Sequence, residues 1–331
     1  MLQRAVKVAA VQAEPVFFDM EKTTDKVIDM MAEAARNGAE LIAFPETFIP
    51  GYPWQIWLDS LAAGMGMVPQ YWANSPKADG PQMARIMAAA KKHSIATVVG
   101  YSESSGGSIY MSQAVISDAG EMVRSRRKLK PTHVERSVFG QGDGSDLEVF
   151  DLGYGNVGAL CCWEHLQPLS KYAMYSMNED IHCAAWPSFS LYRGAANALG
   201  PEVNNAASMI YAVEGGCFVV APCAVVLDHG RAMFCDSPAK EQMLLRGGGF
   251  ARIYNPDGTM LGTPLAEDEE GMVYGTCEPA LQAISKSAAD PAGHYSRPDV
   301  TRLLWNKTRR TPTVISNSVP SMDADAEMVE I

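Results

Sequence analysis

The chain has 331 residues, 47% of them hydrophobic, and carries a net charge of −11 with a pI near 5.1. A chain of this length can bury a large core, and its acidity argues against nucleic acid or an anionic membrane as a main partner, because both attract a basic surface. The sequence has no run of about 18 apolar residues, so it predicts no membrane span. The apolar stretch at the N-terminus is too short for a signal peptide, so we expect a cytoplasmic protein.

The first segments of the chain alternate between strand and helix patterns. Residues 5–12 (AVKVAAVQ) predict a buried strand, and residues 21–37 predict an amphipathic helix that ends at Gly38. Residues 41–44 (LIAF) predict the next strand. A strand, a helix and a strand in close succession are typical of a parallel β-α-β unit.

The rest of the chain continues this alternation and adds hairpins. Residues 118–120 (DAG) form a predicted turn between two strands, and residues 250–262 predict a second hairpin of this kind. We therefore expect an α/β fold with mixed sheets covered by helices. No linker interrupts the pattern, which predicts a single domain over residues 1–310 and a C-terminal tail, 311–331, that is extended or docked on a neighbouring subunit. The further predicted helices cover residues 82–93, 168–178 and 201–214, and the further predicted strands cover residues 95–100, 156–162, 181–186 and 217–223.

The seven cysteines indicate reduced thiols in a reducing compartment. Their number is odd, several lie in apolar runs, and no Cys-x-x-Cys pair occurs. Cys161, Cys162 and His165 form a conceivable metal site, but their spacing matches no zinc pattern, so we expect no metal.

Three predicted strands end in ionisable side chains. Glu46 follows the strand at 41–44, Lys128 follows the strand at 121–127, and Cys161 and Cys162 end the strand that begins at residue 156. Sites of α/β folds gather at the carboxyl ends of strands, although an ordinary ion pair and two buried cysteines would give the same pattern. Neighbouring residues of a strand face opposite ways, so we expect Cys161 in the core and Cys162 at a strand-to-helix turn, where backbone N–H groups and cations favour a thiolate.

A histidine base for Cys162 is an alternative that the sequence does not favour. His165 lies only three residues beyond the thiol, and a backbone carbonyl is an equally good partner for its ring. His133, His182 and His294 have no evident orienting acid either. We therefore expect all four to be structural histidines.

Four long stretches carry a resemblance to a known family. They are FPETFIPGYPWQIW, RRKLKPTHVERSVFGQGDGSDL, GALCCWEHLQPLSKYAMYSMNEDIHCAAWPSFSLY and DPAGHYSRPDV, and their order and separation also fit. The chain resembles the nitrilase branch of the carbon–nitrogen hydrolase superfamily from about residue 5 to about residue 300. The resemblance implies a four-layer α-β-β-α sandwich that pairs across a subunit interface into an α-β-β-α-α-β-β-α dimer. It also implies a homo-oligomer in which dimers build a larger spiral or filament, with the segments 54–75 and 225–245 and the tail supplying contacts.

The resemblance implies a Glu-Lys-Cys site without metal or organic cofactor. Glu46 in FPET matches the catalytic glutamate, Lys128 in RRKLKP the lysine, Cys162 in CCWEH the nucleophile, and Glu135 in THVER a second glutamate. Glu46 would take the thiol proton and later activate water, while Lys128 would face the developing charge and hand over a proton. The backbone N–H of Trp163 would be a second donor that stabilises this developing charge. Without the resemblance, Glu135 would be assigned to a surface salt bridge with Arg136 or Arg127.

Aromatic residues that follow two of the strands predict a substrate pocket. Tyr52 and Trp54 follow the strand that leads to Glu46, and Trp186, Pro187 and Phe189 follow the strand at 181–185. Such walls suit an aromatic nitrile, although packing in the core or in an interface is an equal alternative. Glu164 is expected either to line the pocket or to brace the turn at Cys162.

The resulting hypothesis is an enzyme that converts a small organic nitrile to the carboxylic acid and ammonia through a thioimidate and a thioester on Cys162. The substrates expected are aromatic, arylaliphatic or aliphatic nitriles. A cyanide-degrading hydrolase or an amidase with the same site is the close alternative. A non-catalytic assembly scaffold is the alternative from a different class, and it requires a broken site, whereas all four site residues are present.

Overall fold

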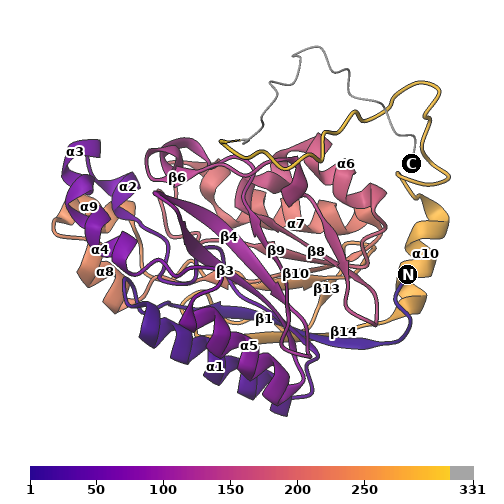
Figure 1. Cartoon of the computed structure of the whole chain (residues 1–331), viewed down its shortest axis with the longest axis horizontal. Helices are drawn as coiled ribbons and strands as arrows, with labels where there is room; N and C mark the ends of the chain where they lie inside the picture. Colours follow the sequence, from indigo (N-terminus) through magenta and orange to yellow (C-terminus); the bar gives the residue numbers. More distant parts are fainter. Residues whose placement is uncertain (314–331) are drawn as a thin grey trace.

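Two β-sheets lie face to face between two layers of helices (Figure 1). The computed structural model describes residues 1–313. The first sheet has the strand order β11-β1-β2-β3-β4-β5, with β14 paired to β1 and β6 to β4, and the second has the order β13-β12-β10-β9-β8-β7. The strands of the first sheet are β1 (Val6–Ala13), β2 (Leu41–Ala43), β3 (Ala96–Ser105), β4 (Ser108–Ile116), β5 (Met122–Arg127), β6 (Phe139–Gly140), β11 (Cys223–Ala224) and β14 (Gly271–Cys277). Those of the second are β7 (Val149–Asp151), β8 (Asn156–Cys161), β9 (Ile181–Ala185), β10 (Phe218–Ala221), β12 (Arg252–Tyr254) and β13 (Met260–Leu261).

Both sheets are mixed, as the hairpins in the sequence predicted. In the first sheet β1, β2 and β3 run parallel, whereas β4 and β5 follow as antiparallel hairpin strands. In the second sheet β8, β9 and β10 run parallel and are flanked by antiparallel β7 and β12. The parallel strands direct their carboxyl ends to one edge of each sheet, where the polar side chains of interest begin.

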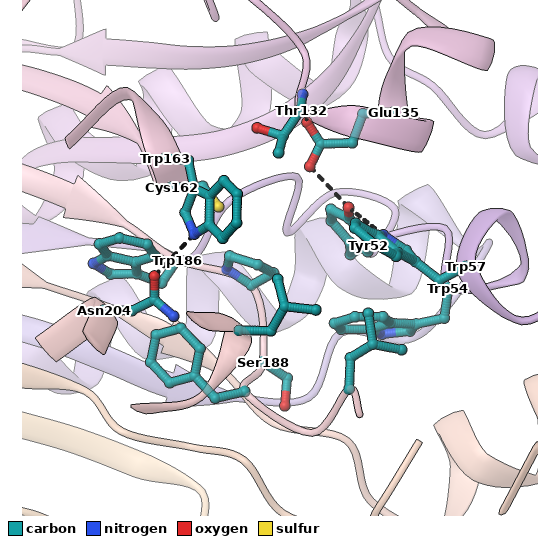
Figure 2. Close-up of a pocket in the computed structure, with 14 residues that line it drawn as sticks. Tyr52, Trp54, Trp57, Thr132, Glu135, Cys162, Trp163, Trp186, Ser188 and Asn204 are labelled. Carbon is teal, nitrogen blue, oxygen red and sulfur yellow. Dashed lines mark hydrogen bonds between the residues drawn. The ribbon is translucent and has the colours of Figure 1, made fainter. Parts of the chain in front are cut away.

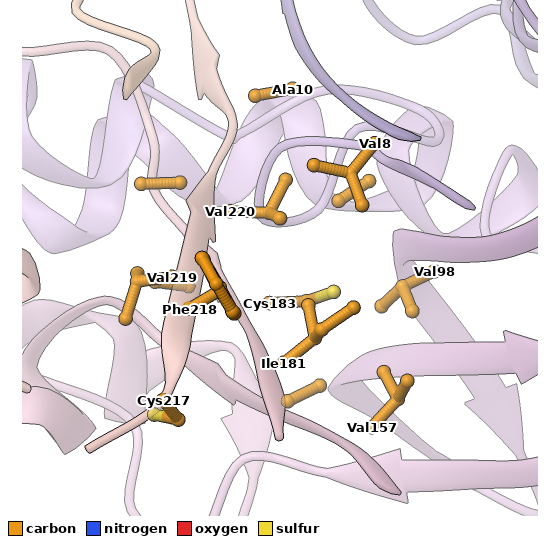
Figure 3. Packing of buried hydrophobic residues seen from close by; sticks show 14 of the residues in the cluster. Val8, Ala10, Val98, Val157, Ile181, Cys183, Cys217, Phe218, Val219 and Val220 are labelled. Carbon is orange, nitrogen blue, oxygen red and sulfur yellow. The ribbon is translucent and has the colours of Figure 1, made fainter. Parts of the chain in front are cut away.

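Strand β1 shows how alternation divides the core into layers. Val8 and Ala10 belong to the cluster between the two sheets, together with residues of the second sheet such as Val157 and Val220 (Figure 3). Ala9 and Val11 point the other way, into the cluster that contains Val27 and Met31 of α1 (Met20–Arg36) and residues of α5 (Pro81–His93). Because successive side chains of a strand face opposite sides, one strand serves both layers.

Helices α6 (Pro168–Ser176) and α7 (Pro201–Gly215) cover the outer face of the second sheet (Figure 1). Their buried residues, such as Met174 and Tyr211, pack with Phe218 of β10. The order of layers is therefore helix, sheet, sheet, helix, and the predicted α-β-β-α sandwich with mixed sheets is confirmed.

The segments 54–75 and 225–245, which the resemblance suggested as sources of subunit contacts, are largely helical. The first contains α2 (Gln55–Leu58), α3 (Leu61–Gly64) and α4 (Val68–Ala73), and the second contains α8 (Asp228–Phe234) and α9 (Pro238–Met243). They pack on each other through a third apolar cluster that includes Tyr71 and Phe234, and Lys240 Nζ lies 2.7 Å from a carboxylate oxygen of Asp59. Short apolar runs between polar residues concealed these helices, because each spans only one or two turns.

The C-terminal part of the described chain follows α10 (Pro279–Ala288). It runs back over the molecule, and the indole N–H of Trp305 donates to the carbonyl of Gly144 at 3.1 Å (Figure 1). Most of the predicted tail, residues 314–331, lies outside the described residues. Within residues 1–313 no helix combines the length and the apolar character that crossing a membrane requires.

Candidate active site

Glu46 follows β2 and is held between the two sheets. Its backbone N–H donates to the carbonyl of Trp186, at the end of β9, at 3.3 Å. Gly100 of β3 allows this approach, because a Cβ atom there would lie 2.1 Å from the carbonyl oxygen of Pro45. The carboxylate of Glu46 is 1% exposed, so the chain brings an acid into the interior at the point where the sheets meet.

Lys128 joins Glu46 to Glu135 in a buried cluster. Its Nζ atom lies 2.8 Å from Oε1 of Glu46 and 2.8 Å from Oε2 of Glu135, and the lysine is fully buried. Glu135 lies in a 3₁₀ turn (His133–Ser137), where it also accepts from the backbone N–H of Thr132 and, at 2.8 Å, from the hydroxyl of Tyr52. Glu135 is therefore paired with Lys128 and not with Arg136 or Arg127.

One oxygen of this cluster is left without a partner. Among the residues that the structure describes, Oε2 of Glu46 forms no hydrogen bond, although it is buried. Burial raises the pKa of Glu46 to about 8, with the charge of Glu135 adding to the rise and Lys128 opposing it. Burial by itself would lower the pKa of Lys128, but Glu135 and Glu46 raise it well above the usual range, so its ammonium persists. The free oxygen is thus a proton acceptor poised near neutral pH.

Cys162 begins the 3₁₀ turn Cys162–Leu166 directly after β8. Its φ of 47° lies in the left-handed region, which is rare for a residue with a side chain and marks a constrained turn. Burial raises the pKa of the Cys162 thiol well above its usual range, Glu46 adds to the rise, and Lys128 and the backbone N–H of Trp163 oppose it. The expectation that the turn favours a thiolate is wrong, because burial outweighs the backbone and cationic neighbours. The resting nucleophile is a thiol and needs a base.

Cys161 and Glu164 brace this turn from the core side. Glu164 accepts from both terminal nitrogens of Arg126 at 2.9 and 2.8 Å, from the backbone N–H of Cys161 at 2.7 Å, and from that of Leu129 at 2.8 Å. Burial alone would raise the pKa of Glu164, but Arg126 and these N–H groups hold it below its usual range. Of the two alternatives for Glu164, the geometry agrees with the second: its carboxylate is not among the groups that line the cavity, and it ties the nucleophile's turn to β5.

A cavity opens in front of Cys162 and Glu135 (Figure 2). The space among its lining atoms measures about 430 Å³, and part of this space is open to solvent. Tyr52, Trp54, Trp186, Pro187 and Phe189 line it, at the positions where the sequence predicted pocket walls. Further lining residues, which the sequence analysis did not predict as pocket walls, are Trp57, Thr132, Trp163, Ser188, Leu191, Leu199 and Asn204.

Hydrogen bonds fix several of the cavity's aromatic rings. The indole N–H of Trp163 donates to Oδ1 of Asn204 at 3.0 Å, and that of Trp57 donates to the hydroxyl of Tyr52 at 2.9 Å (Figure 2). Trp57 ends the aromatic stretch GYPWQIW, which also contains the predicted pocket residues Tyr52 and Trp54, so the sequence could have predicted it as a pocket wall. No local signal marks Leu199 or Asn204, because they come from segments that only tertiary packing brings to the cavity.

The histidines do not offer a base for Cys162. His165 directs Nδ1 to the carbonyl oxygen of Cys162 at 2.6 Å and Nε2 to His182 at 2.8 Å, so its ring is engaged by backbone and by a second ring. His182 in turn faces Glu179 at 2.7 Å, which corrects the expectation that it has no orienting acid. Within residues 1–313 no three His, Cys, Asp or Glu side chains gather as ligands for a metal ion.

Comparisons with known proteins agree with this architecture. The carbon–nitrogen hydrolase family model matches residues 7–285. A protein named nitrilase from Pseudomonas syringae pv. syringae (strain B728a) is 56% identical over 330 residues, covering 100% of this chain and 97% of the relative. One named aliphatic nitrilase from Rhodococcus rhodochrous is 52% identical, covering 98% and 88%. The crystal structure of a carbon–nitrogen hydrolase from Helicobacter pylori G27 shares the fold, with a TM-score of 0.71 at 16% identity over 91% of this chain and 100% of that one. The chain belongs to the nitrilase branch of the carbon–nitrogen hydrolase family.

Proposed function

We propose that this protein hydrolyses organic nitriles to the carboxylic acid and ammonia, with Cys162 as nucleophile and Glu46 as general base. The observation that carries the proposal is the buried oxygen of Glu46 that has no partner within residues 1–313, at a site where burial raises the pKa of both Glu46 and the Cys162 thiol. A thiol that holds its proton and a carboxylate able to accept it are what covalent attack on a nitrile requires. High identity to relatives named nitrilases supports the same reaction.

The first half of the reaction forms a thioimidate. Glu46 accepts the proton of the thiol, the sulfur of Cys162 attacks the nitrile carbon, and the proton passes to the nitrile nitrogen. The ammonium of Lys128 and the backbone N–H of Trp163 stabilise the negative charge that builds on that nitrogen. The raised pKa of Lys128 favours this electrostatic role over the transfer of its own proton.

The second half consumes two waters. The first water adds to the thioimidate carbon with Glu46 as base, ammonia leaves, and a thioester remains on Cys162. The second water releases the carboxylic acid and returns the proton to sulfur, so that one nitrile and two waters give one acid and one ammonia. Glu135 contributes by holding Lys128 and, through Tyr52, one wall of the cavity.

The cavity supports a nitrile with an apolar substituent. Its walls are mainly aromatic and aliphatic side chains, while Glu135, Thr132, Ser188 and Asn204 supply the polar atoms. Aromatic rings of this kind suit aryl or arylaliphatic groups, and long aliphatic groups fill the same space. The Rhodococcus relative named an aliphatic nitrilase supports the aliphatic arm of this range.

A substrate panel tests the proposal. Ammonia and acid release would be measured from benzonitrile, phenylacetonitrile, an aliphatic dinitrile, the corresponding amides, and cyanide. The proposal predicts turnover of at least one organic nitrile and its loss in the Cys162→Ala variant. Turnover of cyanide alone or of amides alone would replace the assignment by the corresponding hydrolase, and a folded protein inactive on every compound would favour the scaffold.

We also propose a single domain, a reducing cytoplasmic location and a homo-oligomer in which dimers build a spiral. All seven cysteines are free in the structure, which supports a reducing compartment. Apolar side chains on the layer of α6 and α7 remain exposed, which supports a self-association surface there. These side chains are Leu166, Leu169, Ile210 and Val213. Light scattering that finds only monomers would contradict the oligomer.

A further inference from the structure

A chain of buried polar side chains ends on the backbone of the nucleophile. The hydroxyl of Tyr211 donates to Oε2 of Glu179 at 2.7 Å, and Oε1 of Glu179 lies 2.7 Å from Nδ1 of His182. Nε2 of His182 lies 2.8 Å from Nε2 of His165, whose Nδ1 reaches the carbonyl oxygen of Cys162 at 2.6 Å. All four side chains are at most 2% exposed, and none of them lines the cavity.

The carbonyl at the end of the chain fixes the direction of the two hydrogen bonds that His165 forms. A carbonyl only accepts, so Nδ1 of His165 carries the proton and its Nε2 accepts from Nε2–H of His182. Nδ1 of His182 then either accepts from a protonated Glu179 or, if His182 is charged, donates to an ionised Glu179. Burial lowers the pKa of His165 to about 3 and that of His182 well below its usual value, and burial raises the pKa of Glu179 to about 8, which favours the neutral pair in which Glu179 donates.

The fold makes room for this chain on the strand that delivers the nucleophile. A Cβ atom at Gly158 of β8 would lie 1.9 Å from Oε1 of Glu179, so only glycine allows the acid to reach His182. The rings are held on several sides: His182 stacks on Tyr211 with centroids 3.8 Å apart, and His165 stacks on Trp186 of the cavity with centroids 5.1 Å apart. A buried network with every member paired is rigid.

The peptide group between Cys162 and Trp163 connects this network to the reaction. In a planar trans peptide the carbonyl and the N–H point in opposite directions, so a donor that holds the carbonyl of Cys162 also aims the N–H of Trp163. That N–H lies close enough to the thiol of Cys162 to oppose the rise of its pKa. A hydrogen bond to the carbonyl also polarises the N–H and strengthens it as a donor.

We propose that Glu179, His182 and His165 are positioning residues that hold the Cys162–Trp163 peptide in its left-handed turn and aim its N–H at the charge that develops during attack. The inference rests on the proposed function in assigning this N–H to the reacting nitrile. The chain acts through hydrogen bonds alone and passes no proton to the substrate.

Four substitutions, two at Glu179 and two at His165, separate a positioning role from a merely structural one. Glu179→Gln preserves the pattern, because its amide donates to His182 and its carbonyl accepts from Tyr211, whereas Glu179→Leu breaks it. His165→Phe removes the donor to the carbonyl of Cys162, and His165→Asn restores a donor near the position of Nδ1 without the link to His182. His93→Phe, at the end of α5 in the opposite layer, is the matched control. Circular dichroism and thermal unfolding identify variants that fold.

The expected result is a loss in kcat at nearly constant KM. A displacement of about 1 Å at a reacting group can cost about 100-fold, and we expect kcat to fall by about that factor in His165→Phe and Glu179→Leu. Glu179→Gln and His93→Phe should stay close to the unsubstituted protein, and His165→Asn should lie between. Equal kcat in all folded variants would overturn the inference, as would an equal loss in Glu179→Gln and Glu179→Leu.

Alkylation by iodoacetamide gives a readout that does not depend on the substrate. Peptide mass spectrometry would follow the modification of Cys162 relative to Cys235, which is more accessible and lies outside the site. Cys162 should react more slowly in His165→Phe and Glu179→Leu but not in Glu179→Gln. If the unsubstituted protein hydrolyses no nitrile, the proposed function fails. The expected differences in the alkylation rate of Cys162 among the variants would still support the positioning role. An unchanged ratio in both disrupted variants would overturn that role.

Discussion

Two buried charged clusters are built on the nearby residues Arg126 and Lys128, and they differ in whether every carboxylate oxygen has a partner. Arg126 and Glu164 form the first, in which the carboxylate accepts from the guanidinium and from two backbone N–H groups, so both of its oxygens are paired. Lys128, Glu46 and Glu135 form the second, in which one oxygen of Glu46 has no partner within the described part of the chain. The first cluster holds the pKa of Glu164 down, whereas in the second burial raises the pKa of Glu46 to about 8.

The difference separates a structural ion pair from a reactive one. A carboxylate whose lone pairs are all used by cations and N–H groups is stabilised in its charged form and has no reason to take a proton. A buried carboxylate with a free oxygen and a second acid nearby gains from accepting one. We call the pair Arg126 and Glu164 the closed cluster, and it fixes the turn that carries the nucleophile. We call Lys128, Glu46 and Glu135 the open cluster, and its free oxygen can exchange a proton with the thiol of Cys162.

Removal of the sulfur next to the open cluster should have the largest effect. Cys162→Ala deletes the atom that becomes acylated, so we expect nitrile turnover to fall to background while the protein remains folded. Cys161→Ala is the matched control, since that thiol faces the core, and it should retain most of the activity. Ammonia release and circular dichroism check both variants. Comparable activity in Cys162→Ala would contradict the assignment of the nucleophile.

Neutralising the open carboxylate should break catalysis without breaking the fold. Glu46→Gln removes the base, and general-base catalysis typically contributes about 10²- to 10⁴-fold, so we expect kcat to fall within that range. Because folding raises the pKa of Glu46 above its unfolded value, its favourable contribution to stability is lost as the pH rises through about 8. The Tm of Glu46→Gln at pH 9 should thus equal or exceed that of the unsubstituted protein. An unchanged kcat would contradict the assignment of Glu46 as the general base.

The same substitution in the closed cluster should do the reverse. Glu164→Gln leaves Arg126 as a buried charge without a counter-ion, which typically costs about 3–5 kcal/mol in the free energy of unfolding. The depressed pKa of Glu164 means that its contribution is present at neutral pH and is lost as the pH falls through the folded pKa. Denaturant unfolding at pH 7 measures the loss. A variant as stable as the unsubstituted protein would show that the two clusters do not differ in this way.

The pH dependence of kcat/KM sharpens the comparison with the smallest expected change. Glu46 acts as a base only when ionised, so kcat/KM should fall as the pH drops below about 8. After burial, the charge of Glu135 contributes to the raised pKa of Glu46, so Glu135→Gln should move the acid limb of the profile to lower pH at reduced overall activity. A limb that stays in place or moves to higher pH would contradict this coupling.

The elements of the fold and the strand-end residues were the parts of the molecule that local pattern could predict. The apolar run in residues 5–12 predicted β1, and the positions of Glu46, Lys128 and Cys162 after strands indicated that three ionisable side chains lie at strand ends. Glu135 lies in a polar stretch that resembles a surface turn, so only the family resemblance identified it. In the structure it is buried and bonded to Lys128 and Tyr52.

The sequence did not predict properties that depend on burial or on residues from distant segments. The thiol of Cys162 was expected to favour its ionised form, but the depth of its burial is set by both sheets and not by its own turn. Asn204 and Leu199 reach the cavity from α7 and the segment before it, and no pattern around them signals a site. Glu179 lies three residues before His182 in NEDIH, yet a strand pattern gives no hint that a turn folds it back onto the ring.

Acid quenching during turnover, followed by peptide mass spectrometry, tests the central claim most directly. The account predicts an acyl group of the substrate's mass on the sulfur of Cys162, none on Cys161, and no adduct in Cys162→Ala. Steady hydrolysis of a nitrile with no adduct on Cys162, or with the acyl group on Cys161, would contradict it.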